Sequence, residues 1–72
     1  MKFEFTPHAR QRYRERNIRY HDVRSVITNP DRIEVSPSGA IEARKKIKSK
    51  LLVVIFEVNR EVRKIITAYY ED

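Results

Sequence analysis

The sequence predicts an α+β domain in which two helices pack on one face of a three- to four-stranded antiparallel sheet. Three observations support this fold class: a short alternating segment leads into a helix-start signal, a second helical pattern ends at an Asn-Pro pair, and from residue 31 apolar residues recur at every second position. At 72 residues the chain has room for one domain, residues 1–72, with one small core.

The N-terminal segment predicts a short strand followed by a helix. Phe3 and Phe5 alternate with charged residues, as in a half-buried strand over residues 2–5. Thr6 can accept a hydrogen bond from the first helical turn, and the proline that follows it suits the first helical position. We therefore expect a helix over residues 7–16, although its apolar stripe is narrow.

A second helix is indicated by Val23, Val26 and Ile27, which share one helical face. Ile18 precedes this stripe at the spacing of a hydrophobic staple, and Asn29-Pro30 ends the helix because proline cannot continue it. The cap position falls on an arginine, which is a poor capping residue.

The second half of the chain predicts a sheet. Residues 32–35 and 40–48 alternate apolar with charged side chains on either side of a Ser-Pro-Ser-Gly turn. Residues 51–56 are apolar on both faces, which is typical of a central strand, and a tight turn then leads into a last strand over residues 62–70. Strict alternation along this last strand places Ile65 on the side of the odd-numbered residues, and it does not decide which side faces the core.

The charge of the chain points to polyanionic partners. Lys and Arg number 16 against 10 Asp and Glu, which gives a net charge of +6, and both halves of the chain share the excess. RNA or another nucleic acid is therefore the leading partner. Because 36% of the residues are charged, the surface ion pairs of a heat-stable protein are a competing explanation for part of this composition.

Several classes of chemistry lack the residues they need. The chain has no cysteine, which excludes disulfides, cysteine-based zinc sites and thiol nucleophiles. It has one glycine and two widely spaced histidines, so we expect no phosphate-binding loop, no metal site and no cofactor. No segment approaches the roughly 20 apolar residues that span a bilayer, and we expect a cytoplasmic protein without a membrane partner.

The first candidate site lies on the first predicted helix. His8, Arg12 and Arg16 are spaced by four residues, so they share one helical face and can bind a phosphate together. His8 is the best candidate for a general base in the chain. The structural alternative is that His8 packs against the sheet while the arginines pair with carboxylates such as Glu15.

The second candidate site is a run of cations. Alternation places Arg44, Lys46, Lys48 and Lys50 on a common face, where they would form a stripe along a phosphate backbone. The alternative is a solvated edge strand whose lysines discourage aggregation.

Tyrosines form the third candidate, since an aromatic ring can stack on a base. Tyr69 and Tyr70 lie near the end of the chain and Tyr13 and Tyr20 near the predicted helices, and such tyrosines more often belong to the core or its rim. RNA cleavage is compatible with this composition, because the 2′-hydroxyl is the nucleophile and the protein supplies only a base, an acid and cations.

The quoted residues resemble the DUF4258 family, whose pattern is roughly T-x-H-A-x-x-R followed by an aromatic residue or Met, x-x-R-x-I, a later N-P and a closing V-T-x-Y. The matching segments are Thr6-Pro7-His8-Ala9-Arg10-Gln11-Arg12-Tyr13-Arg14-Glu15-Arg16-Asn17-Ile18, Asn29-Pro30 and Ile65-Ile66-Thr67-Ala68-Tyr69. Two positions depart from the pattern, since Arg19 stands where the family usually has a Ser or Thr cap and Asn17 replaces a glycine.

The family is similar to the RelE/ParE and BrnT toxins of type II toxin–antitoxin modules, many of which are metal-independent endoribonucleases. The resemblance implies a RelE-like fold, an antitoxin partner, and an active surface that contains His8, Arg12, Arg16, Thr67 and Tyr69. Together with the charge, it predicts a toxin-like ribonuclease or RNA-binding protein in which His8, Arg12 and Tyr69 are catalytic. The cations expected to hold RNA beside Thr67 are Arg16, Arg44, Lys46 and Lys48. The alternative is a non-catalytic module that binds nucleic acid or protein.

Overall fold

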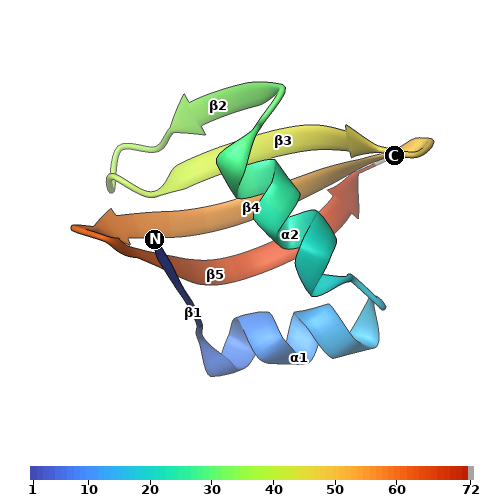
Figure 1. Cartoon of the computed structure of the whole chain (residues 1–72), viewed down its shortest axis with the longest axis horizontal. Coiled ribbons are helices and arrows are strands. Elements are labelled where there is room, and N and C mark those ends of the chain that lie inside the picture. The colour runs from blue at the N-terminus through green and yellow to red at the C-terminus, as the bar shows by residue number, and fades with distance from the viewer. Residues whose placement is uncertain (72) are drawn as a thin grey trace.

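The computed structural model describes residues 1–71, which form two helices and one sheet (Figure 1). In chain order the elements are β1 (Lys2–Phe5), α1 (Pro7–Glu15), α2 (Tyr20–Thr28), β2 (Arg32–Val35), β3 (Ile41–Ile47), β4 (Lys50–Asn59) and β5 (Val62–Glu71). The predicted α+β class and the order of its elements are confirmed. Within residues 1–71, no helix is long and apolar enough to cross a membrane.

The sheet has five strands in the order β1-β5-β4-β3-β2, and it is mixed. Strands β2 to β5 pair antiparallel with their neighbours, whereas β1 joins the far edge parallel to β5, with Lys2 opposite Val62 and Phe5 opposite Ile65. The predicted antiparallel arrangement describes β2 to β5 but not the whole sheet, because β1 adds a fifth, parallel strand. Parallel and antiparallel strands show the same alternation, so the sequence pattern carries no information on direction.

Both helices cover one face of the sheet, and they cover different parts of it. In Figure 1, α2 passes in front of the middle strands, where it contacts β3 and β4, while α1 lies beside β5. The buried core between the helices and this face consists of Ala9, Ile18, Val23, Val26, Ile27, Ala43, Leu52, Val54, Phe56, Ile65 and Ala68. The apolar stripe that predicted α2 is therefore the stripe that packs on the sheet.

A β-bulge in β5 changes which side chains reach this core. Ile55 pairs with Thr67 and Phe56 pairs with Ile65, so β5 holds one extra residue between them. As a result Ile65 and Ala68 both face the helices, and the strict alternation expected for the last strand was wrong for Ile65.

Local chemistry accounts for the start and the end of α1 and for the uncapped start of α2. Thr6 caps α1, since its Oγ1 accepts a hydrogen bond from the Ala9 amide at 3.0 Å. After α1, Asn17 adopts a left-handed conformation (φ 53°), which asparagine tolerates better than most residues, and the Ile18 amide donates to the Tyr13 carbonyl at 3.0 Å. Arg19 precedes α2 and makes no side-chain capping bond, as its residue type predicts.

Candidate nucleic-acid interface

A cation-lined groove of about 590 Å³ runs between α1 and the C-terminal half of β5. We name it the α1–β5 groove, and its lining residues are His8, Arg12, Arg16, Lys50, Thr67, Tyr69 and Tyr70. The residues of the first helix and those of the last strand are about 50 positions apart in the sequence, and the fold brings them together here. Five of the eight predicted site residues line this groove: His8, Arg12, Arg16, Thr67 and Tyr69.

The position of α1 follows from the short length of β1. Strand β1 pairs only with the first residues of β5, up to Ile65, and beyond this point α1 takes the place beside the strand. The Thr6 hydroxyl donates to the Ile66 carbonyl at 3.1 Å, and Arg16 Nη1 donates to the Ala68 carbonyl at 3.3 Å. These bonds satisfy carbonyl groups of the strand and fix α1 against it.

Helical spacing then decides which side chains of α1 enter the groove. Ala9 is buried and Tyr13 packs against the core. His8, Arg12 and Arg16 share the neighbouring helix face by the i, i+4 rule, and His8 is exposed to solvent. Arg12 Nη1 lies 3.2 Å from Glu15 Oε2, in a half-exposed pair worth about 0.2–1 kcal/mol, so a phosphate can compete for this guanidinium.

Strand β5 supplies the other wall from both of its faces. Thr67 and Tyr69 lie on the face opposite the helices, since Ala68 and Tyr70 between and after them pack toward the core. Tyr69 is the cross-strand neighbour of Val53, a fully buried residue on that opposite face. Tyr69 therefore covers apolar surface as well as lining the groove.

Two more residues line the groove: Lys50, which was predicted only as a member of the cation stripe, and Tyr70, which was one of the four candidate tyrosines. Lys50 Nζ lies 5.8 Å from the centre of the Tyr70 ring, a cation–π distance. The same two residues also line an adjoining hollow with Arg19, Asp22 and Lys48, so the cationic surface continues past the end of the groove toward the β3–β4 turn. A lysine and a tyrosine are residue types that bind phosphate and stack on bases, but the sequence does not show that Lys50 and Tyr70 lie together in the groove.

Arg44 lies outside the groove and is surrounded by carboxylates. Its guanidinium pairs with Glu42, with Glu34 at 3.3 Å and with Glu71 at 3.4 Å, and its side chain is 18% exposed. Partial desolvation lowers the pKa of Arg44, but the hydrogen bond to Glu71 and the charges of the three glutamates outweigh it and raise the pKa above its ordinary value. The three carboxylates outnumber the charge of Arg44, so this cluster offers no free positive charge to a phosphate.

Lys46 and Lys48 do not line the groove either, and the predicted stripe of four cations does not form. The chain reverses directly after Ile47, which pairs with Lys50 on the next strand, so Lys48 lies in the turn with φ 60°. The Lys46 amide donates to Asp31 Oδ2 at 2.9 Å. Cations recur at every second position through the turn, so the sequence pattern does not mark the end of β3.

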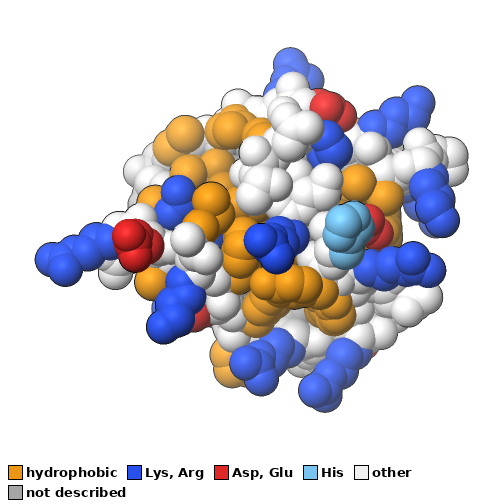
Figure 2. Space-filling model, viewed as in Figure 1, with side chains coloured by type: hydrophobic (Ala, Val, Ile, Leu, Met, Phe, Trp, Pro, Cys, Tyr) orange, Lys and Arg blue, Asp and Glu red, His pale blue; other side chains and the backbone are white. Residues whose placement is uncertain are grey.

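The remaining cations are distributed widely. Figure 2 shows Lys and Arg side chains along much of the outline of the helix-covered face and near its middle, with apolar side chains between them. The groove is thus one concentration of cations on a surface that is positive in general, and the net charge alone would not locate it.

The phenol of Tyr70 predicts a pH dependence of stability. Burial raises its pKa, the Asp22 carboxylate raises it further, and Arg19 partly opposes this. A raised pKa favours the protonated phenol in the folded state, so its contribution is complete below the ordinary tyrosine pKa of about 10 and is lost as the pH rises through the folded-state value. We expect Tyr70→Phe to lose less thermal stability than the wild type between pH 9 and pH 11, measured by circular dichroism. Equal losses would contradict this assignment.

Together these features define a small basic α+β protein with a groove suited to a polyanion between its first helix and its sheet edge. The chain belongs to the DUF4258 family: residues 5–70 match the family described as "Domain of unknown function (DUF4258)". The match covers both helices and nearly every strand, so the family resemblance predicted from the motif is confirmed. No curated protein and no solved structure matches the chain significantly.

Proposed function

We propose that this protein is a toxin-like, metal-independent endoribonuclease of a type II toxin–antitoxin-like system, related to the RelE/ParE and BrnT toxins. The observation that carries the proposal is the α1–β5 groove, in which an exposed histidine lies in one hollow with two arginines, a lysine and two tyrosines. These are the residue types that cleavage of RNA by its own 2′-hydroxyl requires. The proposed setting is the cytoplasm, with an antitoxin as the protein partner.

The proposed reaction needs no group beyond the chain and the RNA. His8 takes the proton from the 2′-hydroxyl, whose oxygen attacks the adjacent phosphorus while the bond to the 5′-oxygen breaks. Arg12 and Lys50 stabilise the charge that develops on the phosphate oxygens. Tyr69 gives a proton to the leaving 5′-oxygen or stacks on a base. The products are a 2′,3′-cyclic phosphate and a 5′-hydroxyl.

A second candidate function is RNA binding without cleavage. It is favoured by the places that three groove residues take within the protein: Arg16 donates to a strand carbonyl, Arg12 pairs with Glu15, and Tyr69 lies opposite the buried Val53 on the neighbouring strand. Side chains with such structural partners can line a binding surface without taking part in chemistry.

One experiment separates the two functions. A fluorescent single-stranded RNA pool of random sequence is titrated with the protein in EDTA, and both anisotropy and cleavage on a denaturing gel are recorded. The ribonuclease proposal predicts cleavage that leaves 2′,3′-cyclic phosphate ends. A control pool of 2′-deoxy strands, which lack the nucleophile, should stay uncut. Bound but uncut RNA would instead favour the binding module.

The salt dependence of the same titration tests the groove contacts. Three or four phosphate contacts predict that affinity falls about 20- to 50-fold between 50 and 200 mM salt, from a slope of about −0.7 per contact on single strands. Loss of Arg12 in an Arg12→Gln variant should lower this slope, while Arg32→Gln, an equal charge change on the exposed β2 strand, should not. Negligible RNA binding even at 50 mM salt would overturn both functions.

A further inference from the structure

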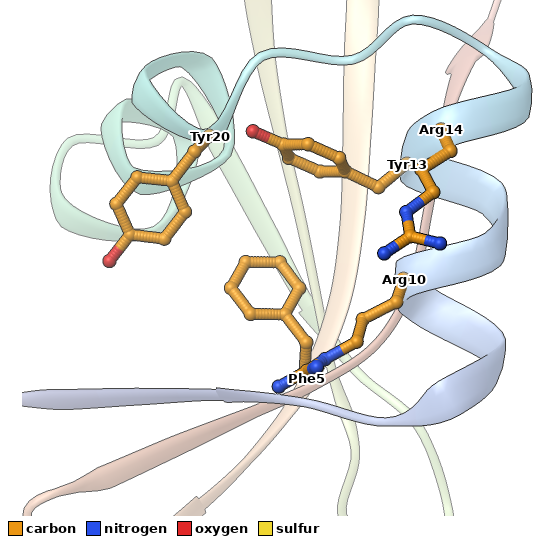
Figure 3. A pocket seen from close by; sticks show the side chains of 5 residues that line it. All are labelled: Phe5, Arg10, Tyr13, Arg14 and Tyr20. Atoms are coloured by element: carbon orange, nitrogen blue, oxygen red, sulfur yellow. The ribbon is translucent and has the colours of Figure 1, made fainter.

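A second hollow, of about 280 Å³, lies on the other side of α1 and shares no lining residue with the groove. We name it the aromatic hollow. Its lining residues are Phe5, Arg10, Tyr13, Arg14 and Tyr20, contributed by β1 and both helices (Figure 3). The family resemblance assigns no role to this surface.

The three rings enclose the hollow without filling it. The Phe5 and Tyr13 rings are 5.8 Å apart and nearly perpendicular, at 78°, while the Phe5 and Tyr20 rings are 5.7 Å apart and tilted by 46°. Rings in such edge-to-face and tilted contacts touch one another, so a further flat group would lie against their exposed side and not between them. Tyr20 is 41% exposed, which is high for an aromatic side chain beside a core.

Two arginines give the hollow its charge. Arg10 and Arg14 are one helical turn apart, both are exposed, and Figure 3 shows both extending from α1 toward the rings. No carboxylate of residues 1–71 lies within 4.0 Å of either guanidinium, and no acidic residue lines the hollow. This contrasts with Arg12 and Arg44, which have such partners.

We propose that the aromatic hollow binds a nucleotide, with the base against the rings and the phosphate on Arg10 and Arg14. A base is flat and stacks on aromatic faces, and a guanidinium binds phosphate through two parallel hydrogen bonds. The volume suits one ring system, which favours a nucleotide over a peptide helix that needs an elongated groove. The inference does not depend on the ribonuclease proposal, because the two sites have separate residues.

The test uses adenosine 5′-monophosphate as the probe, with adenosine and inorganic phosphate as separate arms, and follows backbone amide shifts by NMR. We expect AMP to shift the amides of residues 5–20 and to bind at least tenfold more tightly than either part alone. A 5′-phosphorylated and a 5′-hydroxyl RNA then distinguish a free nucleotide from a strand end as the source of the phosphate.

Exposed positions allow variants that keep the core intact. Arg14→Gln and Tyr20→Leu should each weaken AMP binding at least fivefold, whereas Tyr20→Phe, which keeps the ring, and Arg32→Gln, which removes an equal charge elsewhere, should not. The dispersion of the amide spectrum shows whether each variant is folded. The inference is overturned if AMP binds no better than phosphate, or if an acidic peptide with one aromatic residue shifts these amides and AMP does not.

Discussion

Replacing His8 with alanine should lower the rate of RNA cleavage by about 10²- to 10⁴-fold while leaving RNA affinity nearly unchanged. This is the effect of removing a general base, because the attacking 2′-hydroxyl then keeps its proton until a late stage of the reaction. The groove keeps its arginines and Lys50 for phosphate binding in this variant, so the loss should appear in the single-turnover rate at saturating protein.

The chain contains its own control for this experiment. His21, the only other histidine, is exposed in the first turn of α2 and does not line the α1–β5 groove. His21→Ala should therefore cleave RNA at the wild-type rate. If both variants cleave equally well, or if His8→Ala retains full activity, the assignment of His8 as the base is removed even though the groove itself remains.

The sequence was sufficient for the elements whose signals are local. Thr6 and the proline after it define the start of α1, and the alternation of charged and apolar residues defines the sheet strands, because capping and side-chain period are properties of short segments. Two features of the sheet required the fold. The direction of β1 leaves no trace in its alternation, and the bulge near Ile66 shifts the period of β5 without a glycine to mark it.

In the candidate site, too, some residues could be placed from local sequence signals and others only from the fold. His8, Arg12 and Arg16 could be placed together from helical spacing, which is fixed within one element. Lys50 could not be placed with them, since its position depends on where the β3–β4 turn reverses the chain and on which strand edge α1 occupies. Arg44 was indistinguishable in sequence from a phosphate-binding arginine, because its three glutamate partners come from three different strands.

Thr6→Val should lower the free energy of unfolding by roughly 2 kcal/mol, the largest loss expected from a change this small in volume. The Thr6 hydroxyl has two tasks: it accepts from the Ala9 amide to cap α1, and it donates to the Ile66 carbonyl of β5. Loss of a cap costs about 1 kcal/mol, and a partly buried carbonyl left without its partner costs about as much again.

Thermal unfolding measures this loss directly. For a domain of this size, roughly 2 kcal/mol corresponds to a fall in Tm of about 8–16 °C. Thr6→Ser is the matched control: it keeps the oxygen that makes both hydrogen bonds and removes only a methyl group, so its Tm should stay much closer to that of the wild type. If the valine and serine variants unfold at the same temperature, the hydroxyl does not hold α1 against β5, and the position of the groove depends on the Arg16 hydrogen bond and on packing of Ala9 and Tyr13.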